Sequence, residues 1–304
     1  MDLAINVSAI KEKALSLGFS ECGIASAAHL HVEQSLFEKM INQNRHAGMN
    51  FLERDIARRF APDRYLSGCK SIIVCLFHYP TNVPYNGFYK IARYAHQPDY
   101  HVMMKEKLEE LAASICEISP GVEHKTTVDT APVSEKNWAV KAGLGSIGKN
   151  TLFRSEHGSF CWIGTILTTL VLPPDPEKTI PCGDCDLCVT SCPTGALKPY
   201  QLDCGKCLSF FTTESKGELP DYPAAQPWIF GCDVCQEICP HNQKALQNRN
   251  SDAGFSLFSH LQKTDFDNLT EEQFRMWFKG TSMERRKFER IKEQIRKSGN
   301  SVRM

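Results

Sequence analysis

The spacing of apolar residues over the first 172 positions predicts a mixed α/β domain. A continuous apolar run at 71–79 is typical of a buried strand, and the β-branched and aromatic stretch at 159–172 also indicates strands. Residues 124–130 have an extended pattern. Apolar residues at 101–118 recur with the helical period instead, and a further helix is expected to begin near Ser8. Helical and extended segments therefore alternate along this part of the chain.

The composition changes after this first part. Four prolines fall within the ten residues 172–181, which indicates a domain border. Residues 182–245 are rich in cysteine and in turn-forming residues, and the chain then becomes polar and helical. Thr270 and Gln273 have the spacing of a capping box at a helix start. We expect three parts: an α/β domain over 1–172, a small cysteine-rich domain over 173–250 and a short helical segment over 251–304.

Charge and hydropathy then narrow the class of protein. Lys plus Arg and Asp plus Glu both number 35, so the formal net charge is zero and exerts no global attraction on nucleic acid or membrane. The sequence has no run of about 18 apolar residues, as a spanning helix would need. Its N-terminus lacks the apolar stretch of a signal peptide. We therefore expect a cytoplasmic protein without a membrane partner, in which any polyanion binds to a local patch.

The cysteines carry the clearest chemical pattern in the sequence. Nine of the 14 fall between positions 182 and 239, and a disulfide framework is not expected in a reducing compartment. From Cys182 the chain reads C-x2-C-x2-C-x3-C-P, the bacterial ferredoxin run, in which the fourth cysteine ligates the other cluster. From Cys232 it reads C-x2-C-x3-C-P, a shortened partner of the first group.

Crossed ligation of this kind predicts a ferredoxin-like domain with two [4Fe–4S] clusters. Cluster one would be bound by Cys182, Cys185, Cys188 and Cys239, and cluster two by Cys192, Cys232, Cys235 and either Cys204 or Cys207. A structural zinc site is the alternative, but zinc favours paired CxxC groups with longer separations. The doubled C-x3-C-P ending has no purpose in a zinc ribbon, so we favour iron–sulfur clusters.

A glycine-rich motif at 143–150, GLGSIGKN, formally fits two nucleotide-binding patterns. As a phosphate-binding loop it fails at Asn150, where a Ser or Thr should hold Mg²⁺. As a dinucleotide fingerprint it follows a helical stretch instead of a strand, and no acidic residue lies about 20 positions later. We therefore favour a glycine-rich turn that lets the backbone approach another large cofactor.

Three stretches together resemble the epoxyqueuosine reductase family. These are VDTAPVSEKNWAVKAGLGSIGKNTL at 128–152, the cysteine pattern itself and GCDVCQEICPHN at 231–242. The resemblance covers about residues 50–245. It implies a corrinoid-binding α/β domain holding base-off cobalamin, followed by the two clusters. It also implies the reduction of epoxyqueuosine to queuosine in tRNA, with electrons passing through the clusters to cobalamin.

The resemblance also assigns roles to single residues. It makes Asp129 the proton donor to the epoxide oxygen, a role that would need burial to raise the pKa of its carboxyl. It favours Cys207 over Cys204 as the intervening ligand. The stretches that contact cobalamin would contribute Asp129, Arg59, Tyr94, Asn150, Gly164 and Ser209.

Basic residues gather near the C-terminus. Residues 282–304 hold eight Lys or Arg against three Glu, which is typical of a solvated helix face. If tRNA is the substrate, these side chains would supply phosphate contacts, and the resemblance places Lys216 near the tRNA as well. The candidate tRNA-binding residues are Lys216, Arg285, Arg286 and Lys287.

Two other functions remain open at this point. One is a cobalamin-dependent reductase of another small molecule, since reductive dehalogenases are akin to the family; the other is a ferredoxin-type electron carrier. The family often has tryptophan where His241 stands, and many members continue into a C-terminal helical-repeat domain that 304 residues cannot accommodate. We expect a monomer that takes electrons from an external low-potential donor.

Overall fold

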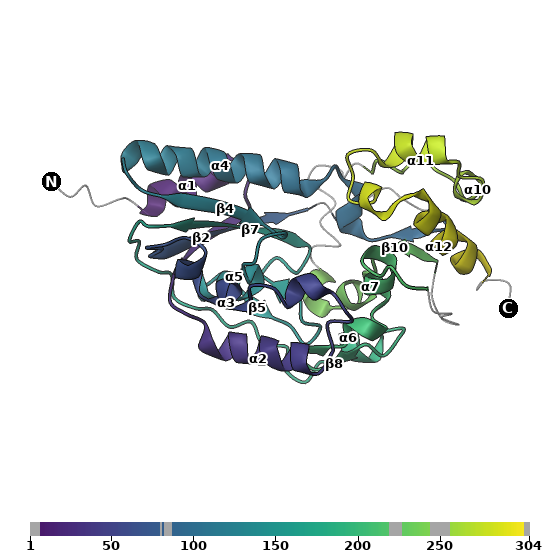
Figure 1. Cartoon of the computed structure of the whole chain (residues 1–304), viewed down its shortest axis with the longest axis horizontal. Helices are drawn as coiled ribbons and strands as arrows, with labels where there is room; N and C mark the ends of the chain where they lie inside the picture. The colour runs from purple at the N-terminus through teal and green to yellow at the C-terminus, as the bar shows by residue number, and fades with distance from the viewer. Residues whose placement is uncertain (1–6, 80, 82–86, 219–226, 244–255, 301–304) are drawn as a thin grey trace. The chain divides into compact units, whose positions relative to one another are not determined.

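The computed structural model describes residues 7–79, 81, 87–218, 227–243 and 256–300. By its packing the chain divides into two compact units (Figure 1). The first contains residues 1–78 and 101–183, and the second contains residues 79–100 and 184–304.

The first unit is built on a four-stranded antiparallel sheet with the order β1-β2-β7-β4. Its strands are β1 (Glu21–Ser26), β2 (Ser71–His78), β4 (His124–Val128) and β7 (Cys161–Thr168). The two central strands, β2 and β7, are almost entirely buried, as the apolar runs at 71–79 and 159–172 predicted. The extended segment predicted at 124–130 forms the edge strand β4.

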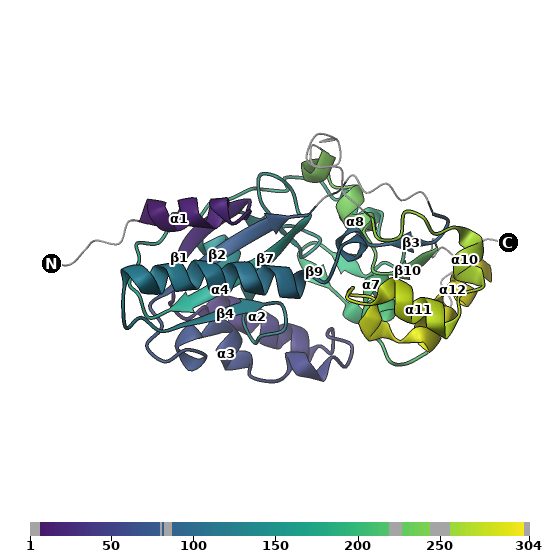
Figure 2. The ribbon, with the colours of Figure 1, turned by 90° about the horizontal axis from the view of Figure 1, so that it is seen from above.

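One face of this sheet is covered by α1 (Val7–Ser16) and α4 (Tyr100–Ile118), which lie side by side (Figures 1 and 2). The helix predicted at 101–118 is thereby confirmed. The other predicted helix is α1, and Ser8 lies inside its described part and is not its cap. Among the helices that the structure describes, none is both long and apolar enough to cross a bilayer.

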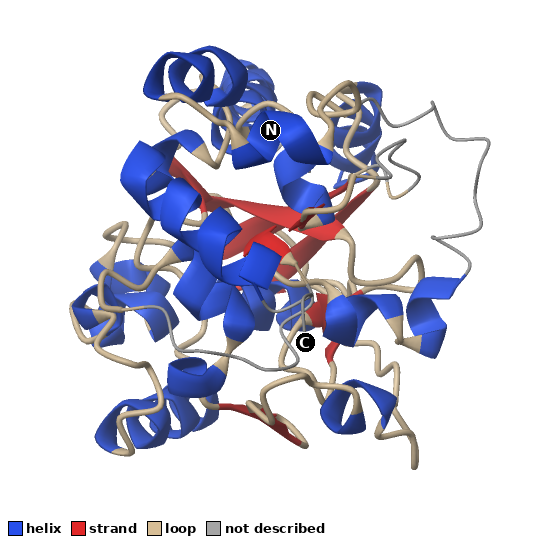
Figure 3. Cartoon of the chain, turned by 90° about the vertical axis from the view of Figure 1, so that its right-hand side faces the viewer, coloured by secondary structure: helices blue, strands red, loops and turns tan. Residues whose placement is uncertain are grey.

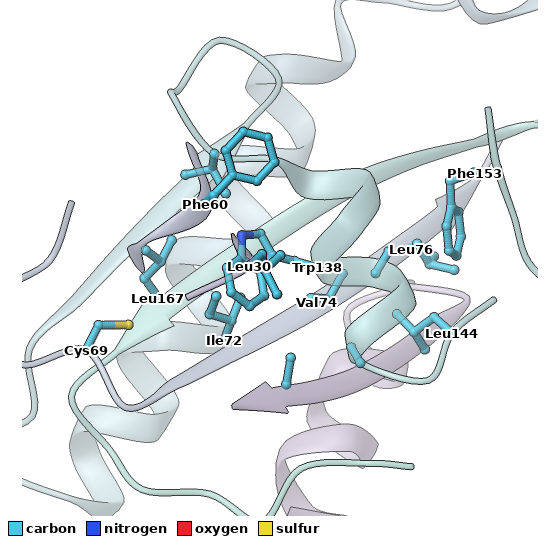
Figure 4. Packing of buried hydrophobic residues seen from close by; sticks show 14 of the residues in the cluster. Leu30, Phe60, Cys69, Ile72, Val74, Leu76, Trp138, Leu144, Phe153 and Leu167 are labelled. Carbon is cyan, nitrogen blue, oxygen red and sulfur yellow. The ribbon is translucent and has the colours of Figure 1, made fainter. Parts of the chain in front are cut away.

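The opposite face of the sheet carries an apolar core (Figure 4). Trp138 of α5 (Glu135–Lys141) and Phe60 of α3 (Ile56–Phe60) are fully buried against strand residues such as Ile72. With α2 (His31–Asn42) on the same side, the sheet lies between two helical layers (Figure 3). The short strands β5 (Ser146–Ile147) and β6 (Phe153–Arg154) form a hairpin beside α5.

The second unit consists mainly of short elements. In the cysteine-rich segment these are α6 (Leu187–Thr190), β8 (Leu197–Lys198), β9 (Gln201–Leu202), α7 (Leu208–Thr213), β10 (Trp228–Phe230) and α8 (Val234–Glu237). The C-terminal segment forms α10 (Lys263–Asp267), α11 (Glu271–Phe278) and α12 (Phe288–Asn300). Thr270 and Gln273 make the predicted capping box at the start of α11. Single 3₁₀ turns lie at Asn50–Leu52, Pro62–Arg64, Arg93–His96, Cys204–Lys206, Pro240–Asn242 and Glu284–Arg286.

The packing of the second unit differs from the three parts expected from composition. Strand β3 (Lys90–Ile91) pairs with β10, so residues 79–100 join the cysteine-rich segment. Tyr89 packs in one core with Phe274 and Ile291 of the C-terminal helices, which gather beside β3 and β10 (Figure 2). Composition reports where polarity changes along the chain, whereas this grouping depends on which apolar faces meet.

His96 gives this unit a pH-dependent stability. Its side chain is buried, with Nδ1 2.8 Å from the Ser256 hydroxyl and Nε2 3.1 Å from the Ile91 carbonyl oxygen. Burial lowers the pKa of His96 from 6.5 to about 4. Between these values the unfolded chain binds a proton that the folded state does not bind. Stability should therefore fall as the pH drops from about 6.5 towards 4.

Thermal unfolding of the wild type and of His96→Gln checks this expectation, because glutamine does not titrate. The difference in Tm between the two proteins should shrink as the pH falls from about 6.5 to 4. A difference that stays constant over this range would show that His96 does not carry the effect.

Candidate active site and cluster-binding cysteines

Asp129 stands directly after β4 in a constrained backbone conformation. Its φ of 57° lies in the left-handed region, which is uncommon for a residue other than glycine. The backbone N–H of Asp129 donates a 2.7 Å hydrogen bond to Oε1 of Glu135, at the start of α5. Its carboxylate Oδ2 lies 3.2 Å from Nε2 of His101. The fold thus places a carboxylate, an imidazole and a second carboxyl group together.

The two acidic groups of this cluster differ in their surroundings. Burial raises the pKa of Glu135 to about 8, and the nearby charge of Asp129 raises it further, while the N–H of Asp129 opposes the shift. The side chain of Asp129 is 60% exposed. Burial therefore favours the protonated form of Glu135, a residue of the 128–152 stretch that its motif alone does not mark as functional.

Arg59 is tied to the same loop. The N–H of Ser134 donates to the Arg59 carbonyl oxygen at 3.0 Å, and Nη2 of Arg59 donates to the Phe51 carbonyl oxygen at 2.8 Å. Burial lowers the pKa of the Arg59 guanidinium. Its Nε is buried and has no hydrogen-bond partner among the described residues. A buried donor of this kind is suited to an amide or phosphate oxygen, both of which cobalamin carries.

Gly164 and Asn150 have structural explanations of their own. Gly164 lies opposite Val128 on the neighbouring strand, and a Cβ at Gly164 would come within 2.7 Å of the Leu108 side chain on α4. Asn150 is buried, and its Oδ1 accepts from the N–H of Leu152 within the glycine-rich turn. Their cobalamin contacts stay a prediction from the family resemblance.

In the second unit, the cysteines predicted for cluster two are electrostatic neighbours. Burial raises the pKa of Cys232 to about 12, and Cys207 and Cys192 raise it as well. The pKa of Cys235 is raised by burial and then by Cys232 and Cys207. Cys207 precedes α7, with the N–H groups of Ser209 and Phe210 directed at its sulfur.

This set of partly buried thiols fits an iron–sulfur cluster. Neighbouring thiols oppose the deprotonation of Cys207, Cys232 and Cys235, so the thiolate forms of these residues need positive charge close by, which bound iron supplies. Among the described residues, no three His, Cys, Asp or Glu side chains lie close enough to hold a single metal ion. A four-iron cube differs from a single ion because it binds each thiolate through a different iron.

Arg93 fixes α8, the short helix that contains Cys235. Its N–H donates to Oδ2 of Asp233 at 2.7 Å, and its guanidinium bonds Glu237 on α8. Asp233 is 1% exposed, and burial raises its pKa to about 6 although Arg93 opposes the shift. The segment 79–100 therefore supports the cluster-binding segment.

Cys182, predicted for cluster one, belongs to the first unit, whereas Cys185, Cys188 and Cys239 belong to the second. Its sulfur accepts a 2.8 Å hydrogen bond from Nη1 of Arg154 and a 3.4 Å hydrogen bond from the N–H of Lys149. Nothing in the local sequence marks Arg154 as a partner of a cysteine 28 positions later. The ligand set of cluster one stays a prediction.

The candidate tRNA-binding residues have different environments. Lys216, Arg285 and Lys287 are exposed. Arg286 is partly buried instead, and its guanidinium donates to the carbonyl oxygens of Phe211 and Thr212 at the end of α7, at 2.9 Å each. Arg286 therefore stabilises this unit internally. Of the remaining predicted residues, Tyr94 packs near Phe230, with ring centres 6.0 Å apart.

Two known sequence families match separate parts of the chain. Residues 59–130 match the family described as epoxyqueuosine reductase QueG, DUF1730. Residues 181–242 match the family described as a 4Fe-4S double cluster binding domain. The second match covers every cysteine assigned to the two clusters, so the prediction of a double-cluster domain is confirmed.

Individual relatives match over nearly the whole chain. The epoxyqueuosine reductase of Leadbetterella byssophila is 37% identical over 291 residues, which cover 94% of this chain and 96% of the relative. That of Salmonella typhimurium is 32% identical, covering 94% of this chain and 77% of the relative. Among solved structures, epoxyqueuosine reductase from Streptococcus thermophilus has a TM-score of 0.88 at 28% identity and covers 99% of this chain and 82% of its own.

A second solved structure, an epoxyqueuosine reductase with an epoxyqueuosine-modified tRNA-Tyr stem loop, has a TM-score of 0.80 at 26% identity. It covers 96% of this chain and 80% of its own. These likenesses extend through the sheet, the Asp129 loop and the cysteine-rich segment described above. The chain belongs to the epoxyqueuosine reductase family.

Proposed function

We propose that this protein reduces epoxyqueuosine to queuosine in tRNA. The reaction removes the epoxide oxygen as water, which requires two electrons and two protons and leaves a carbon–carbon double bond. The observation that carries the proposal is the similarity to epoxyqueuosine reductases along 94% of the chain. The Asp129 loop and the gathered cysteines supply the two kinds of chemistry that the reaction needs, proton transfer and electron transfer.

The cofactors of this reaction would be two [4Fe–4S] clusters and cobalamin. When bound, the clusters supply one-electron transfer and cobalamin supplies a metal centre that can hold two electrons. The proposed ligands are Cys182, Cys185, Cys188 and Cys239 for cluster one, and Cys192, Cys207, Cys232 and Cys235 for cluster two. The residues proposed to contact cobalamin are Arg59, Tyr94, Asp129, Asn150, Gly164 and Ser209.

The protein's own residues supply the proton chemistry. The Asp129 carboxyl is the group proposed to protonate the oxygen released from the opened epoxide, so that it leaves as water. His101 lies within hydrogen-bond reach of that carboxylate and can return a proton to it. Glu135 fixes the backbone of Asp129 through its 2.7 Å hydrogen bond and retains its own proton at neutral pH.

The remaining partners follow from the substrate. A tRNA ligand requires cationic side chains, and the exposed Lys216, Arg285 and Lys287 are the proposed phosphate contacts. Electrons would come from an external low-potential donor. We place the reaction in the cytoplasm, where tRNA is modified, and expect the protein to act as a monomer.

Mass spectrometry of tRNA gives the direct test. Anaerobically reconstituted protein, loaded with iron, sulfide and cobalamin, is incubated with a strong reductant and tRNA that contains epoxyqueuosine. The modified nucleoside should lose one oxygen atom, 16 mass units, in tRNA digests. Protein that retains both cofactors and leaves the epoxide intact would contradict the proposal.

A further inference from the structure

The glycine-rich motif at 143–150 builds a tight hairpin around one arginine. A Cβ at Gly145 would collide with the Arg154 carbonyl oxygen, so glycine lets β5 and β6 approach each other closely. A Cβ at Gly148 would lie 3.1 Å from Nη1 of Arg154 and 2.9 Å from Oδ1 of Asn150. The absence of a side chain leaves room for the Arg154 backbone at Gly145 and for the Arg154 guanidinium at Gly148, which explains these two glycines without a nucleotide.

The guanidinium of Arg154 is directed at Cys182. The residue is only 4% exposed, and Nη1 donates to the Cys182 sulfur at 2.8 Å. Nη2 donates to the carbonyl oxygen of Ile180, two residues before the cysteine. The N–H of Lys149, which follows Gly148 in the motif, also points to the sulfur at 3.4 Å. Two donors from one hairpin therefore converge on one sulfur atom.

This arrangement is suited to an anionic sulfur. A buried guanidinium is costly unless an opposite charge accompanies it, and the Arg154 contacts within the described part of the chain are a sulfur and a carbonyl oxygen. Its Nε has no hydrogen-bond partner among those residues. A neutral thiol would leave the charge uncompensated, whereas an iron-bound thiolate would form a charge-assisted hydrogen bond with it.

We propose that Arg154 tunes the cluster that Cys182 ligates, raising its reduction potential through the hydrogen bond to the Cys182 sulfur. The inference rests on the proposed function, which makes Cys182 a cluster ligand. Reduction of a [4Fe–4S] cluster adds one electron and therefore one negative charge. A nearby buried cation and two hydrogen-bond donors stabilise that charge, so the reduced cluster is favoured.

Redox titration followed by electron paramagnetic resonance tests this role on the reconstituted full-length protein. Arg154→Gln removes the charge, and Arg154→Lys keeps the charge but loses the planar fork. Arg275→Gln is the matched control, because Arg275 is exposed on α11 and pairs only with Glu271 among the described carboxylates. Iron content is measured first for each protein, so that the potentials refer to assembled clusters.

One of the two midpoint potentials should fall in Arg154→Gln, and the other should stay unchanged. At a fixed potential, we expect about a tenfold lower ratio of reduced to oxidised cluster, which corresponds to about 59 mV for one electron. Arg154→Lys should give a smaller shift in the same direction, and Arg275→Gln none. Unchanged potentials in both Arg154 variants, or equal shifts of both clusters, would overturn the proposal.

A separate variant tests the assumption about the ligand. Cys182→Ser should lose the signal and the iron of the cluster whose potential shifts in the Arg154 variants. A Cys182→Ser protein with both clusters intact would overturn the assignment of Cys182 and with it the role of Arg154. Conversion of epoxyqueuosine is measured independently, so failure of the enzyme assay is distinguishable from failure of this inference.

Discussion

Replacing Asp129 with Asn is expected to lower turnover of epoxyqueuosine-containing tRNA by roughly 10²- to 10⁴-fold, the usual range for loss of a general acid. Asparagine has nearly the same shape and also adopts the left-handed conformation that φ of 57° requires. The loop and its N–H bond to Glu135 should therefore persist, and both cofactors should remain bound. Single-turnover assays by mass spectrometry, with iron and corrinoid content measured in parallel, check the prediction. Near-normal turnover would remove Asp129 from the mechanism.

Glu135→Gln is the matched control for this substitution. Glutamine keeps an oxygen that accepts from the Asp129 N–H, so the variant should retain far more activity than Asp129→Asn. Burial raises the pKa of Glu135 to about 8. Deprotonation above that pH places a second negative charge beside Asp129, and that charge makes the Asp129 carboxyl a weaker proton donor. Wild-type turnover should therefore decline as the pH rises through 8, and the variant should lack this decline; a decline of equal size in both proteins would exclude Glu135 as its cause.

The elements of the first unit were predictable because each is recorded in local spacing. The apolar run at 71–79 became the central strand β2, and the helical period at 101–118 became α4. The membership of 79–100 in the second unit was not predictable. It depends on the pairing of β3 with β10 and on the contacts of Arg93 with Asp233 and Glu237, all more than 130 residues apart in sequence.

In the candidate site, too, features recorded in local spacing were predictable and features that depend on tertiary contacts were not. The double-cluster segment was recognisable because cluster binding requires fixed short spacings, such as those that begin at Cys182. The residues that contact Asp129 and Cys182 could not be predicted. Glu135, His101 and Arg154 reach them through tertiary contacts that no motif encodes. Arg286 shows the same limit, since a basic cluster in sequence does not reveal which of its members bond to the backbone of their own unit; its contact with tRNA stays a prediction.

The second large expected effect concerns which of two cysteines, Cys207 or Cys204, completes cluster two. Cys207 lies near Cys232 and Cys235, two of the thiols proposed for cluster two, and immediately precedes α7. The other end of that helix is held by Arg286 and by Gln294, whose Nε2 donates to the Thr212 carbonyl oxygen at 2.9 Å. A short helix bound at its far end keeps the Cys207 sulfur in a fixed position, as a cluster ligand requires.

Cys207→Ala should therefore lose about half of the bound iron, the share of one cluster in two, and turnover should fall to background because electron transfer is interrupted. Cys204→Ala is the matched control, with the same substitution three residues earlier in the turn Cys204–Lys206. It should keep its full iron content and most of its activity. Iron and sulfide analysis, together with electron paramagnetic resonance of the reduced proteins, measures both. Loss of a cluster in Cys204→Ala and its retention in Cys207→Ala would reverse the assignment, and loss in neither would mean that another residue completes cluster two.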